Sequence, residues 1–219
     1  MPTRIFDYLL FPNQQFYDGR LLPVPIAHQR ATSLDYDTPA QDPLDELLKS
    51  RRVLFLKTND ESIYSPPLAG ERSGVGFEVS EAYLVADLLR RIHRFYGNNF
   101  DTDKTVGVIV PYRSQIAAIR AELEKLGIAA LLDIAIDTVE RFQGSQRDVI
   151  IYSFAVSHVY QLDFLTASTY TDEHGHLIDR KLNVALTRAR KQMIMVGNAQ
   201  ILRNNALFRQ LIDAYSFNS

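Results

Sequence analysis

The sequence has no cysteine among its 219 residues. That absence excludes disulfides, thiolate metal sites and cysteine nucleophiles, and it fits a reducing compartment. No stretch approaches the roughly 18 consecutive apolar residues that a membrane-spanning helix needs. The N-terminus also lacks the apolar core of a secretory signal. The sequence therefore predicts a soluble, intracellular protein with no membrane partner.

An excess of charge of either sign is also missing. Lys and Arg total 24, Asp and Glu total 26, and the net charge is −2. This excludes a protein that coats polyanions generally, although a local basic face is compatible with it. Hydrophobic residues make up 46% of the chain, enough to form a core and exclude disorder. The length corresponds to between one and two domains of about 150 residues.

No P-loop of the pattern G-x-x-x-x-G-K-[ST] occurs. The glycine-dense stretch at 70–76 lacks both the lysine and a preceding strand. No Asp-Glu pair follows an apolar strand, where it would hold Mg²⁺. The chain therefore carries neither of the two elements with which a P-loop enzyme binds a triphosphate and its metal.

From residue 53 onward, short apolar runs alternate with helical patterns, which predicts a parallel sheet in an α/β layered domain. Gly97 and Gly127 are positioned to end the first two helices. The expected strands span 53–56, 106–110, 134–139, 148–155 and 193–196. The expected helices begin after Ser80, near 113, at 179 (running to 190) and after Asn198.

Two segments depart from this alternation. Residues 1–50 hold six of the nine prolines and little periodicity, which predicts an extended segment packed on a main domain at 51–219. Residues 157–178 form a polar insertion between a strand and a helix, and loops of that length are usually functional or mobile. Within it, residues 172–176 include two histidines, which we interpret as a solvated loop and not a metal site.

Three polar clusters follow or join the predicted strands. Residues 111–115 open a helix, where free N–H groups beside Arg113 and Gln115 suit phosphate; alternatively both side chains face solvent. Residues 138–148 are longer than a tight hairpin needs, yet they also fit a solvated link with a buried Phe142.

The third cluster, residues 180–191, contains five basic residues and no acidic one. We expect one helix face to carry four of its polar side chains, with Arg188 on the adjoining face. A cationic helix end also complements the helix dipole, so this charge run by itself leaves both interpretations open. The four side chains are Arg180, Asn183, Thr187 and Arg190.

Together and in this order, the three clusters resemble motifs IV, V and VI of superfamily 1 helicases. The stretches are VGVIVPYRSQ, IDTVERFQGSQRDVII and LNVALTRARKQMIMVG. The resemblance is to the second, C-terminal RecA-like motor domain in the branch of the nonsense-mediated-decay and immunoglobulin-switch-region helicases. FPNQQFYDGRL at 11–21 resembles the segment after motif III, so the likeness covers nearly the whole chain.

The resemblance implies roles around ATP for four residues. Arg188 would be the arginine finger on the γ-phosphate, because a guanidinium stays charged and matches phosphate oxygens. Arg113 would be a second phosphate contact. Gly144 would allow close approach of the backbone to the nucleotide. Gln146 would accept a hydrogen bond from the ribose, at a position where the family usually has Glu.

It also implies that Pro111, Tyr112, Thr138 and Gln143 lie on the path of single-stranded DNA or RNA. ATP and Mg²⁺ would be held mainly by a first RecA-like domain that precedes residue 1 in the same polypeptide. We therefore expect no ATPase activity from this chain alone. Two alternatives are a stand-alone RecA-like binding or regulatory module and an unrelated α/β nucleotide-binding domain.

Overall fold

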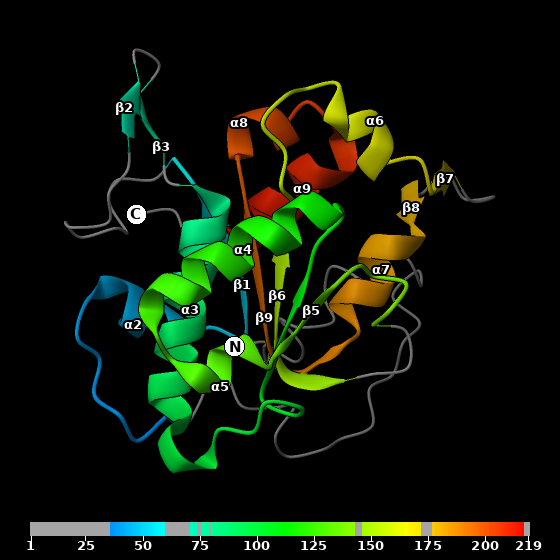
Figure 1. Ribbon diagram of the computed structural model, residues 1–219. Coiled ribbons are helices and arrows are strands. Elements are labelled where there is room, and N and C mark those ends of the chain that lie inside the picture. The colour runs from blue at the N-terminus through cyan, green and yellow to red at the C-terminus, as the bar shows by residue number, and fades with distance from the viewer. Residues whose placement is uncertain are drawn as a thin grey trace, which may run out of the picture.

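The fold is a five-stranded parallel sheet with helices on both faces, as Figure 1 shows. The strand order is β1-β9-β6-β4-β5. The predicted α/β class, a RecA-like parallel sheet flanked by helices, is confirmed. The computed structural model describes residues 36–59, 71–73, 76–78, 80–142, 146–171 and 177–216.

The strands of the sheet match the predicted apolar runs closely. They are β1 (Val53–Lys57), β4 (Val106–Ile109), β5 (Ala135–Asp137), β6 (Arg147–Ser153) and β9 (Ala189–Gly197). β5 is shorter than predicted, and β9 begins four residues earlier than predicted, because its first residues pair with the start of β6. Every residue of β4 is buried, as a strand covered on both faces requires.

Alternate residues of each strand enter two separate cores. On one face, Leu54 and Leu56 pack with helices α2 (Pro43–Ser50), α3 (Glu81–Tyr96), α4 (Arg113–Leu126) and α5 (Ala129–Leu132). On the other face, Val53 and Phe55 pack with α6 (Gln161–Leu165), α7 (Arg180–Leu186), α8 (Ala199–Leu202) and α9 (Ala206–Tyr215). This period of two is what fixes each side chain to its face.

The start of α3 agrees with the prediction, and the helix boundaries differ from the predictions in two other places. Ser80 precedes α3 as predicted, but its side chain makes no capping hydrogen bond. The predicted helix 179–190 ends at Leu186, because the chain must straighten to enter β9. The predicted last helix is divided into α8 and α9, since Asn205 caps a second start by accepting from the N–H groups of Leu207 and Phe208.

The prediction of an extended segment over 1–50 is wrong for its last eight residues, which form α2. The Asp42 side chain caps this helix and Pro43 occupies its first turn, which proline favours. The Asp45 carboxylate is fully buried against Arg91 and Arg94 of α3. Residues 1–35, including the 11–21 stretch, lie outside the described part of the chain.

The predicted loop at 157–178 contains regular structure. It begins with α6 and continues into a hairpin of β7 (Thr169–Thr171) and β8 (Leu177–Asp179). A second hairpin pairs β2 (Glu71–Ser73) with β3 (Gly76–Glu78), and a 3₁₀ turn, η2 (Gly97–Asn99), follows α3. The histidine-containing stretch 172–176 lies outside the described residues.

The link from β5 to β6 is long because these strands are parallel and β4 lies between them. The chain must return from the carboxyl ends of the strands to their amino ends, which a two-residue hairpin cannot do. The predicted burial of Phe142 is confirmed, and its ring lies over Gly107 of β4. A Cβ at Gly107 would be only 2.7 Å from the ring, so this link needs glycine there.

Within the described residues, none of the helices combines the length and the apolar character that crossing a membrane requires.

Candidate functional site

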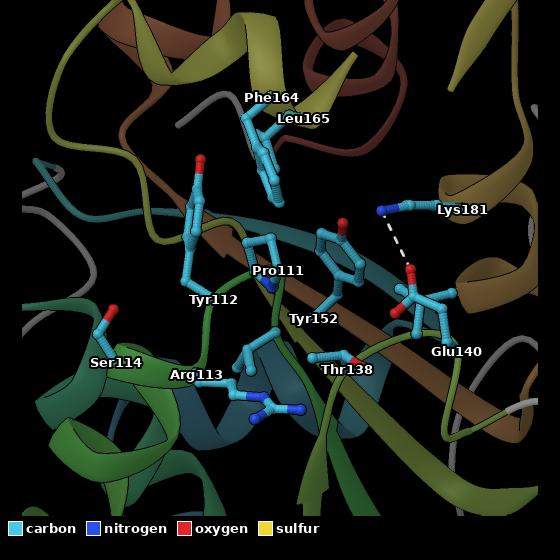
Figure 2. A pocket seen from close by; sticks show the side chains of 12 residues that line it. Pro111, Tyr112, Arg113, Ser114, Thr138, Glu140, Tyr152, Phe164, Leu165 and Lys181 are labelled. Carbon is cyan, nitrogen blue, oxygen red and sulfur yellow. Dashed lines mark ion pairs between the residues drawn. The ribbon is translucent and has the colours of Figure 1, made fainter. Parts of the chain in front are cut away.

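Polar and aromatic side chains surround a cavity of about 470 Å³ at the carboxyl edge of the sheet (Figure 2). The segment after β4 and the segment after β5 form two of its sides, and α6 and α7 contribute the others. Parallel α/β sheets bind ligands at this edge. The lining residues are Val110, Pro111, Tyr112, Arg113, Ser114, Thr138, Val139, Glu140, Tyr152, Phe164, Leu165 and Lys181.

Tyr112 joins two walls of this cavity. Its hydroxyl donates to the backbone oxygen of Gln161 at 3.2 Å, and its ring stacks on Phe164 with centroids 4.9 Å apart. These contacts tie the start of α4 to α6. Burial raises the pKa of Tyr112, so the phenol remains neutral and able to donate.

The opposite wall carries an ion pair between Glu140 and Lys181, 3.0 Å apart (Figure 2). The backbone N–H of Glu140 and the Lys181 ammonium hold the pKa of the Glu140 carboxyl below its usual value. The ammonium also lies 5.5 Å from the centre of the Phe164 ring. A cation, an anion and an aromatic ring therefore meet at one side of the cavity.

The Arg113 side chain is exposed and pairs with no carboxylate of the described residues. The helix that carries it is fixed by its neighbour Gln115, which donates to Ser153 at the end of β6. Ser153 in turn donates to Glu81, and the same carboxylate accepts from the backbone N–H of Ala155. Glu81 thus anchors the cavity from α3.

The second group of predicted residues lies at the amino edge of the sheet. Gln146 directly precedes β6 and Arg188 directly precedes β9, and these strands are neighbours. The backbone N–H of Arg147 donates to the carbonyl of Arg188 at 3.1 Å. The Arg188 side chain donates to the carbonyl of Val184 and to the Thr187 hydroxyl, which holds it near the end of α7.

The basic cluster 180–191 does not form the single helix face that the sequence predicts. Three of its cations pair with carboxylates: Lys181 with Glu140, and Arg190 and Lys191 with Asp148. A fourth, Arg180, lies over the ring of Tyr170. The prediction is wrong because α7 ends at Leu186, which leaves Thr187 at the helix end and Arg190 in β9.

The structure therefore divides the predicted site residues between two edges. Pro111, Tyr112 and Thr138, predicted on the strand path, line one cavity, and Arg113 lines it with them. Gln146 and Arg188, predicted around the nucleotide, lie together at the other edge. Arg113 does not join Arg188, because one follows a parallel strand and the other precedes one. Gln143 and Gly144 lie outside the described residues.

Sequence reasoning did not select Glu140, Lys181, Tyr152 or Phe164 for the site. Glu140 stands inside the stretch that resembles motif V, and Lys181 directly precedes the one that resembles motif VI, so their position at these motifs was an available signal. Tyr152 belongs to an apolar strand and is indistinguishable there from a core residue. Phe164 lies in the insertion, where no periodicity predicts which side chain faces the cavity.

Comparison with known proteins identifies the family of the chain. The family model described as "AAA domain" matches residues 4–200. Among the relatives, Helicase sen1 of Schizosaccharomyces pombe is 36% identical over 213 residues, which cover 94% of this chain and 11% of that protein. The Drosophila melanogaster homolog of Regulator of nonsense transcripts 1 is 28% identical over 94% of this chain and 15% of its own length.

An uncharacterized ATP-dependent helicase of Methanocaldococcus jannaschii is 27% identical over 92% of this chain and 26% of its own length. The chain thus spans between about a tenth and a quarter of these relatives. The fold and the matches define the class as a RecA-like helicase-type domain. The chain belongs to the AAA-domain family, in the branch that contains the nonsense-mediated-decay helicases.

Proposed function

We propose that the chain is the second motor domain of an ATP-dependent helicase or translocase acting on single-stranded DNA or RNA. In this proposal Arg188 is the arginine finger, and a first RecA-like domain of the same polypeptide supplies most of the triphosphate site. The relatives' names support the helicase class, and one of them includes ATP dependence. The single observation that carries the role of Arg188 is that its guanidinium is held in place without pairing with a carboxylate of the described residues.

Arg188 is half-buried and has no carboxylate partner among the residues that the structure describes. Its guanidinium donates hydrogen bonds to a carbonyl and to a hydroxyl, both of which are neutral. The other four cations of the basic cluster are balanced by carboxylates or by an aromatic ring. A positioned guanidinium without an acidic partner is suited to receive an external anion such as a phosphate.

In this proposal ATP lies at the amino edge, where Arg188 would contact the γ-phosphate and Gln146 would accept a hydrogen bond from the ribose. Gln146 is exposed and neighbours Arg188 across two parallel strands, so both can serve one ligand. The bound nucleotide would supply the phosphoanhydride whose hydrolysis drives movement. The described residues hold no cluster of three metal-ligating side chains, so we assign Mg²⁺ to the first domain. Gly144 is still proposed to allow close approach of the backbone to the nucleotide.

The cavity at the carboxyl edge is proposed as part of the single-strand path. Pro111 and Tyr112 present a stiff ring and an aromatic ring, Thr138 presents a hydroxyl, and Arg113 presents a cation. Gln143 lies outside the described residues, and its place on the strand path stays a proposal from the resemblance. Aromatic rings stack on bases irrespective of sequence, and cations track the phosphates. In this proposal Arg113 contacts the nucleic-acid strand and not the nucleotide, because Arg113 lines the same cavity as Tyr112.

The test is Arg188→Ala in the full-length gene product, with Arg190→Ala as the matched control. We expect the Arg188 variant to lose about 10³–10⁵ in kcat for ATP, because fingers of this kind act in the transition state. The control removes a guanidinium two residues away whose partners are Asp148 and the Lys104 carbonyl. Its kcat should fall far less. Equal losses in both variants would contradict the proposal.

A further inference from the structure

Helix α6 and the two residues before it present an apolar surface beside the cavity. Leu162 and Leu165 face the core, whereas Val159, Tyr160 and Phe164 are 54%, 70% and 51% exposed. These are three of the five large hydrophobic side chains that are exposed among the described residues. Such side chains gathered on one short segment mark a binding surface more often than scattered ones do.

The Phe164 ring is held in a fixed orientation although half of its surface is exposed. Tyr112 stacks on it with an angle of 27° between the ring planes, and the Tyr112 hydroxyl is hydrogen-bonded to the backbone of the same helix. Rigid aromatic rings lose little conformational entropy when a ligand binds. A preoriented, accessible ring of this kind is suited to stack on a planar base.

Lys181 places a cation next to that ring. Its side chain is 42% exposed, and its ammonium contacts the Glu140 carboxylate and lies near the Phe164 ring. The ion pair is accessible to solvent, so its net stabilisation is small. A phosphate can therefore compete with Glu140 for the ammonium at little cost.

We propose that Phe164 stacks on a base of a single strand held in the cavity, while Lys181 exchanges Glu140 for a phosphate of that strand. This rests on the proposed function, which places the strand at the carboxyl edge. The occupant is a nucleic-acid strand, because an exposed ring beside an exposed cation matches both parts of a nucleotide. The surface also continues directly from the cavity that Tyr112 and Arg113 line.

The stacking is tested with Phe164→Leu, which keeps an apolar side chain and removes the aromatic face. The probes are fluorescein-labelled oligo(dT) and an abasic strand with the same phosphates, with binding to residues 1–219 read by fluorescence anisotropy. We expect the variant to bind oligo(dT) about fivefold or more weakly and the abasic strand unchanged. Leu132→Ala, an exposed apolar side chain on α5, is the control and should bind both probes normally.

The phosphate contact is tested with Lys181→Met, and Lys125→Met on α4 is the matched control, since Lys125 also pairs with a glutamate. The Lys181 variant should lower the log–log salt slope by about 0.7 for both probes, whereas the control should not change it. Glu140→Gln should tighten binding, because it frees the ammonium. Unchanged affinities in the Phe164 and Lys181 variants, beside a wild-type chain that binds, would overturn only this inference. Absence of wild-type binding would overturn the strand site as well.

Discussion

At the scale of single residues, position along a parallel strand decides what a side chain can contact. Arg113 and Arg188 are both arginines within helicase-like stretches, and the resemblance implies that both contact phosphate of the bound nucleotide. The structure places them at opposite edges of the sheet, because Arg113 follows β4 and Arg188 precedes β9. A motif identifies which residues are candidates for a site. Which of these residues lie close together can be predicted only when the strand order, and the end of the strand at which each residue lies, are also known.

Gly107 is a second example at the level of single residues, because the ring of Phe142 occupies the space that a Cβ at this position would need. We predict that Gly107→Ala lowers the free energy of unfolding by about 1–3 kcal/mol, because the added Cβ overpacks a buried contact. Urea denaturation followed by circular dichroism measures this loss. In a Phe142→Leu background the same substitution should cost less, since the ring that meets the Cβ is gone. An equal cost in both backgrounds would show that the ring contact is not the cause.

At the scale of elements, apolar runs in the sequence predict the strands, and capping residues predict several helix ends. The sequence does not predict α2 or α6. α2 lies in a proline-rich segment, and its stability comes from contacts with α3 that no local pattern reveals. Arg91 contacts Asp42, Asp45 and Asp87, three carboxylates from two helices. α6 is only five residues long and is fixed by Leu162, Leu165 and the Tyr112 hydrogen bond.

The contacts of Asp42 predict a pH dependence of this α2–α3 junction. Burial raises the pKa of the Asp42 carboxyl, but Arg91, the Asp45 N–H and the Arg94 charge together outweigh it and lower the pKa below 3.8. A pKa lowered by folding stabilises the protein above the unfolded pKa and ceases to do so as the pH falls through the folded pKa. The stabilisation is therefore complete near neutral pH and disappears in acid, below 3.8.

The variant Asp42→Asn tests this, because asparagine still caps the helix but carries no charge. Urea midpoints measured from about pH 7 to about pH 3 should show the wild type above the variant at neutral pH, with the gap narrowing in acid. Asp103→Asn is the control: that carboxylate is exposed and forms no ion pair with the described residues. A gap for Asp42→Asn that stays constant with pH would mean that the charge of Asp42 does not stabilise the junction.

At the scale of the whole molecule, the sheet separates the proposed contact with the nucleotide from the proposed contact with the nucleic-acid strand. Of the described residues, those proposed to contact the nucleotide lie at its amino edge and those proposed to contact the strand lie at its carboxyl edge. The buried residues of β6 and β9 connect the two edges through continuous backbone pairing. In the proposed function, a rigid sheet of this kind would move both edges as one body when the cleft to the first domain closes.

This separation predicts that the two contacts can be removed one at a time. Residues 1–219 should bind fluorescein-labelled oligo(dT) and hydrolyse no ATP, because the chain has no P-loop. Arg113→Met should weaken strand binding and lower the log–log salt slope by about 0.7, whereas Arg188→Ala should leave both unchanged. Anisotropy titrations at several salt concentrations and a phosphate-release assay measure these outcomes. Hydrolysis by the isolated chain that Arg188→Ala abolishes would mean that a complete catalytic site lies within these residues. Weakened strand binding in the Arg188 variant would mean that the strand reaches the amino edge.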